Sequence, residues 1–223
     1  MATDPLEALR EECELVSQTL LSLSEDDFQK PTRLPAWNVK ELLGHMHRGV
    51  DRINTALDLP ELLEADTDSV SYWRRYNPRK DAPDIAERAK SVAESFESGH
   101  ALAASWDQMW RRALGRAADA DRKRVVVTWG PALTLNEFLR TRVLEITAHR
   151  MDLNAALGRP PDPTDPGLEI TTAVLLELLG ADLPDVREWD DRALVEVGLG
   201  RRELTEAERR DLGWLAGAFP LIQ

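Results

Sequence analysis

Four long segments of the chain repeat apolar residues at intervals of three and four, the spacing that places side chains along one face of an α-helix. The first segment, which follows Asp4, carries the apolar residues Leu6, Leu9, Cys13, Val16, Leu20 and Leu23. A helix with one apolar face must bury that face against another element. A short β-branched run at residues 124–128 cannot form a sheet alone. The pattern therefore predicts an all-α fold built on a four-helix bundle.

Capping signals and helix breakers set the ends of these helices. We expect helices over residues 5–23, 39–57, 83–118 and 135–157. Asn38 and Thr134 each stand three residues before a glutamate, the arrangement of a capping box at a helix start. The third helix contains Ser98-Gly99, where we expect a kink rather than an end.

The chain divides into two parts after the fourth helix. We expect residues 1–158 to form the helical bundle and residues 159–223 to form a Pro-rich linker and a short C-terminal helical extension that packs on the bundle. In the extension, the pattern predicts a helix over residues 168–179, an irregular piece to Gly200, and a last helix that Thr205 caps.

The charge of the chain excludes several kinds of partner. Its 40 acidic and 28 basic side chains give a formal charge of −12. Nucleic acid and anionic lipid bind to clustered Lys and Arg, so we expect neither as a partner. Because no run resembles a membrane span or a signal peptide, we expect a cytoplasmic protein. The single cysteine, Cys13, lies on the apolar face of the first helix and is predicted to be a buried hydrophobe rather than a catalytic thiol.

Histidines and carboxylates are therefore the side chains left to bind a metal. His149 follows Glu145 by four residues in the fourth predicted helix, so both lie on one face, at the edge of the apolar stripe. This pair alone is weak evidence for a metal site, because glutamate and histidine at this spacing also form ordinary surface hydrogen bonds. A third ligand must come from another helix.

The second predicted helix offers two histidines for that role. His45 and His47 are two residues apart, so they point about 160° away from each other on a helix and cannot both bind one ion. Both flank the apolar stripe of this helix, one on each side, and the helical periodicity does not choose between them.

Two stretches of the sequence together resemble a known family. The stretch from Trp37 to Met46 and the stretch from Arg142 to Gly158 are similar, in spacing and order, to the mycothiol-dependent maleylpyruvate isomerase family of the DinB-like superfamily. The resemblance implies a DinB-like four-helix bundle. It also implies that His45, Glu145 and His149 bind a divalent metal, most often zinc.

The same resemblance implies a chemistry. Three protein ligands leave a coordination position open for a thiol, which the metal would deprotonate. The implied thiol is mycothiol, and its thiolate would attack a small electrophile that bears a carboxylate, as an isomerase or as an S-transferase does. In the long connection over residues 58–81, the side chains of Tyr72, Arg75 and Arg79 are candidates to line the pocket for this substrate. The alternative for this segment is a solvated surface loop.

Other functions remain open at this point. Water instead of thiol at the metal would make the chain a hydrolase, although no obvious general base is present. A helical binding or dimerisation module without catalysis is a third possibility, and exposed helix faces are compatible with a homodimer. We expect the part of this sequence after the linker to be too short for the sterol-carrier-like domain that the resemblance associates with the isomerase itself, which leaves the substrate open. Asp152 either orients a ligand or has a structural role, and we favour the structural role. His47 and His100 are expected to be exposed or packed.

Overall fold

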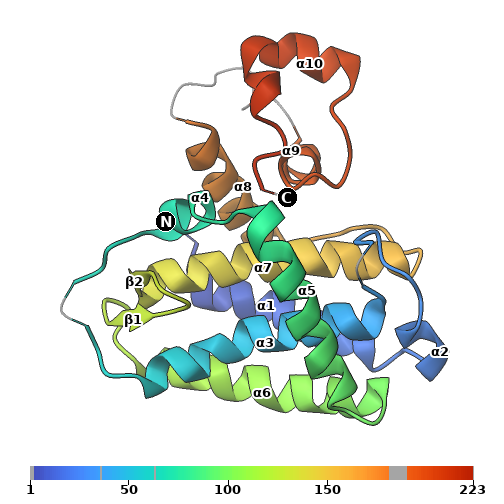
Figure 1. The fold of residues 1–223 in the computed structure, drawn as a ribbon, viewed down its shortest axis with the longest axis vertical. Coiled ribbons are helices and arrows are strands. Elements are labelled where there is room, and N and C mark those ends of the chain that lie inside the picture. The colour runs from blue at the N-terminus through green and yellow to red at the C-terminus, as the bar shows by residue number, and fades with distance from the viewer. Residues whose placement is uncertain (1–2, 36, 63, 181–189, 223) are drawn as a thin grey trace.

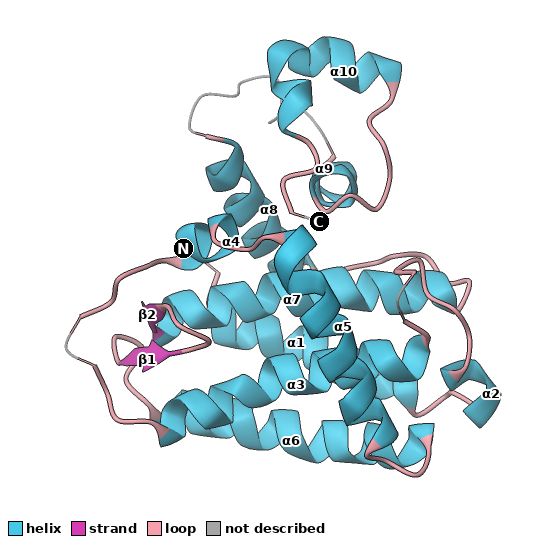
Figure 2. Cartoon of the chain, in the orientation of Figure 1, coloured by secondary structure: helices cyan, strands magenta, loops and turns pink. Residues whose placement is uncertain are grey.

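The computed structural model describes residues 3–35, 37–62, 64–180 and 190–222, and it is mostly helical (Figures 1 and 2). Its elements are α1 (Pro5–Leu20), α2 (Glu25–Phe28), α3 (Val39–Asp58), α4 (Ser69–Arg74), α5 (Pro78–Glu94), α6 (Gly99–Asp119), β1 (Val125–Val127), β2 (Ala132–Thr134), α7 (Leu135–Ala156), α8 (Asp165–Leu179), α9 (Asp191–Gly198), α10 (Glu206–Leu212) and the 3₁₀ helix η2 (Gly213–Ala218). The prediction of an all-α helical bundle is confirmed.

Helices α1, α3, α6 and α7 form the bundle and lie side by side in Figure 1. Their apolar faces meet in one core, where Trp106 and Trp110 are almost completely buried. The indole Nε1 of Trp110 donates a hydrogen bond to Oγ of Ser17 at 2.9 Å, so this large side chain is buried without an unpaired donor. Cys13 is fully buried in the same core, as predicted, and burial raises the pKa of its thiol well above the usual value.

Capping side chains set the starts of the two helices that matter most for the site. Asn38 and Glu41 form a complete capping box at the start of α3, with hydrogen bonds of 2.9 and 2.8 Å. At the start of α7, Oγ1 of Thr134 accepts from the backbone N–H of Glu137 at 3.2 Å. The Glu137 carboxylate does not close the predicted box, because it accepts hydrogen bonds from the backbone N–H and the hydroxyl of Ser69.

The single third helix expected over residues 83–118 is wrong, because α5 and α6 are separate helices. Oγ of Ser98 accepts from the N–H of Ala101 at 3.0 Å and so caps a new helix rather than kinking an old one. A Cβ on Gly99 would lie 2.2 Å from the ring of Phe28, so this close approach requires glycine. The break allows α5 to cross α3 instead of continuing the bundle (Figure 1).

The β-branched run forms half of a two-stranded antiparallel hairpin. Strand β1 pairs with β2, with Val125 opposite Thr134 and Val127 opposite Ala132. The sequence pattern favours a brief strand or an extended turn here and does not identify the partner strand.

The C-terminal helices lie along one side of α7, at the top of Figure 1. Helix α8 packs on α1 and α7, α9 packs on α8, and Thr205 and Glu208 form the predicted capping box of α10. The irregular piece expected before Gly200 contains helix α9, and the rest of it, residues 181–189, lies outside the described residues. No helix of the described chain is both long and apolar enough to cross a membrane.

Candidate metal centre

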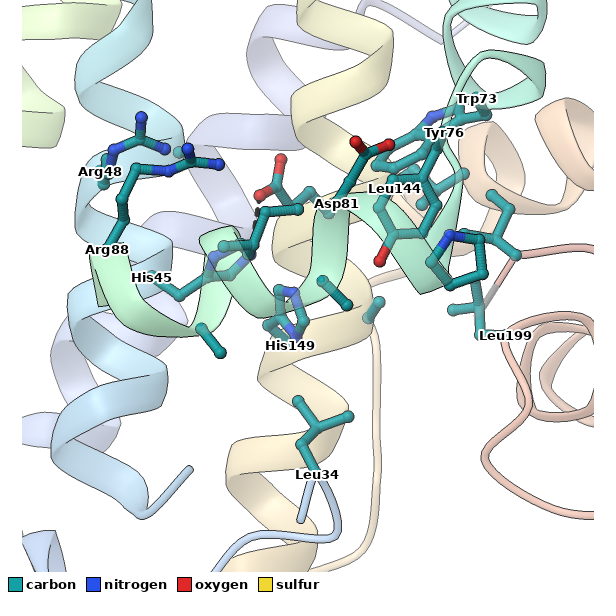
Figure 3. A pocket seen from close by; sticks show the side chains of 18 of the residues that line it. Leu34, His45, Arg48, Trp73, Tyr76, Asp81, Arg88, Leu144, His149 and Leu199 are labelled. Atoms are coloured by element: carbon teal, nitrogen blue, oxygen red, sulfur yellow. Dashed lines mark ion pairs between the residues drawn. The ribbon is translucent and has the colours of Figure 1, made fainter. Parts of the chain in front are cut away.

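His45 on α3 meets Glu145 and His149 on α7. One ligand atom from each of the three side chains lies within 4.8 Å of the other two. Nε2 of His45 is 2.9 Å from Oε1 of Glu145, and the two imidazole rings are centred 4.7 Å apart (Figure 3). The i,i+4 spacing on α7 and the packing of α3 against α7 therefore bring all three candidate ligands together.

Glu145 lies between a histidine and an arginine. Its carboxylate pairs with His45 and with Arg142, which lies one turn earlier on α7. Burial alone would raise the pKa of the Glu145 carboxyl, but the charge of Arg142 and the hydrogen bond from His45 hold the pKa well below its usual value. A Cβ at Gly49 would lie only 3.0 Å from Oε1 of Glu145, so this glycine makes room for the carboxylate. Glu145 is thus an ionised candidate ligand whose carboxylate is held in place.

The two imidazoles are held differently. Burial lowers the pKa of His45, which favours its neutral, metal-binding form at neutral pH. The ring of Trp37 stacks on that of His45 with the centroids 4.7 Å apart. Nδ1 of His149 is 3.0 Å from Oδ2 of Asp152, which leaves Nε2 of His149 as its atom for binding a metal.

Asp152 contacts a candidate ligand directly. Its carboxylate also accepts from Nε of Arg33 at 2.6 Å and from Nε and Nη2 of Arg201 at 2.9 Å each. Burial alone would raise the pKa of Asp152, but the hydrogen bond from His149 and the charge of Arg201 lower it well below the usual value. We expected a structural role for Asp152, whereas its contact with Nδ1 favours the role of orienting His149.

The donor set fits a divalent metal. Two imidazole nitrogens and one carboxylate oxygen, gathered and mostly buried, are the ligands that zinc accepts in catalytic sites. Iron, nickel and manganese accept the same donors. A carboxylate behind one histidine is the usual support of such a ligand.

A cavity of about 500 Å³ opens beside these residues. Its wall includes residues from α3, α4, α5 and α7, and the C-terminal part supplies Leu199, Arg201 and Ile222. Apolar side chains such as Leu34 and Leu144 lie in the same wall (Figure 3). The candidate metal ligands therefore face a space that a small molecule can occupy.

The expected substrate residues fall only partly on this cavity. Tyr72 lines it, is buried, and accepts a hydrogen bond on its hydroxyl from Nη2 of Arg142 at 3.1 Å. Arg75 and Arg79 are exposed and do not belong to its wall, and Arg75 is 3.4 Å from a carboxylate oxygen of Asp66. Our expectation that these two arginines line the pocket is therefore wrong for this cavity, because their side chains turn to solvent.

Other arginines take their place in the wall. They are Arg48, Arg52, Arg88, Arg142 and Arg201. A signal for two of them was present in the sequence, because Arg48 and Arg52 follow His45 by three and seven residues and so share its face of the helix. Asp81 and Asp84 add acidic side chains to the wall.

The remaining histidines lie outside the site. Nε2 of His47 is 3.0 Å from Oγ of Ser105 on α6, so His47 packs between helices of the bundle. His100 is exposed and pairs with Glu25. Both positions agree with the packing or exposure that we expected.

The sequence model of a family described as the mycothiol maleylpyruvate isomerase N-terminal domain matches residues 9–154. The match spans most of the bundle and contains all three candidate ligands. No curated protein and no solved structure matches the chain significantly.

Proposed function

The chain belongs to the mycothiol maleylpyruvate isomerase N-terminal domain family, and from this premise we propose that it is a metal-dependent enzyme that uses a low-molecular-weight thiol, mycothiol, to attack a small electrophile. One observation carries the proposal. His45, Glu145 and His149 meet within 4.8 Å in the wall of a cavity of about 500 Å³. These ligands leave at least one coordination position for a molecule in the cavity.

A bound divalent metal, zinc in our proposal, would lower the pKa of a coordinated thiol and so supply a nucleophile near neutral pH. The thiol must come from a small molecule, because the single cysteine of the chain, Cys13, is fully buried in the bundle core. This is the role we propose for mycothiol.

The residues of the chain itself prepare the site for this chemistry. Asp152 holds the proton on Nδ1 of His149, which keeps Nε2 free to bind. Arg142 balances the charge of Glu145, and Trp37 holds the ring of His45 in place. Apolar side chains such as Leu34 and Leu144 in the cavity wall offer a surface for the carbon skeleton of a small substrate.

Two outcomes are open to the attacking thiol. In an isomerase it adds to a conjugated double bond and leaves after rotation, whereas in an S-transferase it stays on the product. We propose this pair of activities together, and thiol consumption separates them: a transferase consumes one thiol for each product, whereas an isomerase consumes none.

The first test is the metal content of protein purified without chelator and without metal-affinity resin, measured by elemental mass spectrometry. We expect about one equivalent per chain in the wild type and a loss of metal in His149→Ala, because one of three ligands is removed. His47→Ala is the matched control, since His47 lies on the same helix as His45 but contacts Ser105, and this variant should keep the metal.

The enzyme assay follows with a panel of electrophiles, with and without mycothiol. Turnover that requires both metal and thiol supports the proposal. Turnover without thiol identifies a metal-dependent hydrolase instead. A protein that neither contains nor takes up metal overturns the proposal and leaves a helical binding module.

A further inference from the structure

Three of the arginines in the cavity wall lack an ion-pair partner among the described residues. Arg48 and Arg52 lie on α3 and Arg88 lies on α5. In the part of the chain that the structure describes, no ion pair joins any of the three to an acidic side chain. The other two arginines of the wall are paired, Arg142 with Glu145 and Arg201 with Asp152.

Arg48 and Arg88 lie near each other in the cavity wall, and Arg52 follows Arg48 by about one turn of α3. The guanidinium groups of Arg48 and Arg88 lie together on one side of His45, and Asp81 lies on the other side (Figure 3). Burial, with the charges of Arg52 and Arg88, lowers the pKa of Arg48 to about 10, and the carboxylate of Glu145 acts in the opposite direction. The carboxylate of Asp81 is in addition occupied by the backbone N–H of Asn77 at 2.8 Å.

Such a cluster of like charges lowers the stability of the folded chain unless an anion binds to it. Arg48 and Arg52 are four residues apart on one helix, an arrangement in which like charges destabilise. Guanidinium groups bind carboxylates and phosphates with paired hydrogen bonds, and this binding is stronger away from bulk water. Locally unfavourable features of this kind are typical of functional sites.

We propose that Arg48, Arg52 and Arg88 form an anion subsite that selects a substrate with at least two negative charges, carried by carboxylate or phosphate groups. The inference rests on the proposed function, because it names the class of electrophile that the thiol would attack. At about 1.5 Å of rise per residue, Arg48 and Arg52 lie about 5 and 10 Å along α3 from His45. The anionic group of the substrate therefore lies about one to two helical turns from its reacting atom.

The test is direct binding by calorimetry to full-length protein as purified. The probes are succinate and inorganic phosphate, each with two charges, and acetate, with one. We expect succinate or phosphate to bind and acetate to bind much more weakly, and the stronger of the two divalent probes identifies carboxylate or phosphate as the preferred group. Arg48→Gln and Arg88→Gln should each weaken that binding about 10-fold or more, as expected for loss of a charge-assisted hydrogen bond.

Arg79→Gln is the matched control. Arg79 and Arg88 lie on the same helix, nine residues apart and so on opposite faces; both are exposed, but only Arg88 lines the cavity. This variant should bind the divalent probe as the wild type does. Wild-type affinity in both Arg48→Gln and Arg88→Gln, or no binding of either divalent probe, would overturn the proposal.

His149→Ala separates this proposal from the proposed function. Binding that persists in His149→Ala and falls in Arg48→Gln places the anion on the arginines whether or not the chain proves to be a metal enzyme. Binding that disappears in His149→Ala and persists in Arg48→Gln shows that the anion sits on the metal, which contradicts the subsite.

Discussion

Nδ1 of His149 donates a hydrogen bond to Oδ2 of Asp152 at 3.0 Å, and Asp152 is completely buried. Because the pKa of the Asp152 carboxyl is low, this group is ionised and can only accept a hydrogen bond. The shared proton therefore resides on Nδ1 of His149. The three-residue spacing on α7 produces this contact within one turn of helix. The tautomer of a candidate metal ligand is therefore fixed by Asp152, a side chain that is not itself one of the three candidate ligands.

Asp152→Asn should weaken zinc binding about 10- to 100-fold, as loss of a supporting carboxylate does in other zinc sites. The amide is close in shape but has no charge, so the variant tests the orientation and basicity of His149 more than packing. Competition with a chromophoric chelator measures the affinity. Asp107→Asn is the control, because Asp107 forms an exposed pair with Arg111 far from the site, and equal affinity in both variants would contradict the role of Asp152.

Arg201 connects the C-terminal part of the chain to the same carboxylate. Its guanidinium donates from Nε and Nη2 to the two oxygens of Asp152, at 2.9 Å each. Arg201→Gln should weaken zinc binding by less than Asp152→Asn does, about 10-fold, because Arg33 still holds Asp152. The measurement is the same chelator competition.

Arg202→Gln is the control for this prediction. Its guanidinium pairs with Glu208, within the C-terminal part, and among the described residues it forms no hydrogen bond or ion pair with the candidate metal ligands or with Asp152. We expect wild-type zinc affinity in this variant. If both arginine variants lose affinity equally, the C-terminal part acts through its overall stability and not through Asp152.

Much of the site followed from the sequence because helical spacing is local. Glu145 and His149 share a face wherever α7 packs, and the capping residues Asn38 and Thr134 located the starts of their helices. The choice of His45 over His47 did not follow from periodicity, since both flank the apolar stripe. It came from the family resemblance, and the structure places His45 beside Glu145 and His47 beside Ser105.

The parts that the sequence did not reveal depend on contacts between distant segments. The helix break before Gly99 depends on the ring of Phe28, which requires a residue without Cβ at this place. The crossing of α5 over α3 then brings Arg88 close to Arg48. The spacing of residues within one helix cannot indicate such a contact between two helices. Arg75 and Arg79 had the right charge for a substrate pocket but lie on the solvent side of their segments.

Glu12 is a second buried carboxylate, and it supports the fold rather than the site. It is completely buried on α1, pairs with Arg150 of α7, and accepts from the N–H and the hydroxyl of Thr164, each at 2.8 Å. Glu12→Ala should lower stability by about 3 to 5 kcal/mol, because Arg150 is left buried without its partner. For a chain of this length, the melting temperature should fall by about 10 °C.

The exposed neighbour Glu11 provides the control for Glu12. Glu11→Ala should leave the melting temperature within about 1 to 2 °C of the wild type, as surface substitutions commonly do. Differential scanning calorimetry measures both variants. A small effect of Glu12→Ala would mean that water reaches Arg150 and replaces the lost carboxylate.

In the arginine cluster we expect a substitution to raise the stability of the fold, whereas Glu12→Ala lowers it. Removing Arg48 relieves its repulsion with Arg52 at i,i+4, which is worth about 0.2 to 0.5 kcal/mol. Arg48→Gln should therefore raise the melting temperature by about 1 to 2 °C in low salt, and the gain should shrink in high salt as the charges are screened. Arg79→Gln, which removes an exposed charge outside the cavity, should show no such gain. A lower melting temperature in Arg48→Gln would mean that the Arg48 side chain stabilises the folded chain, and that its charge is not a cost accepted for binding an anion.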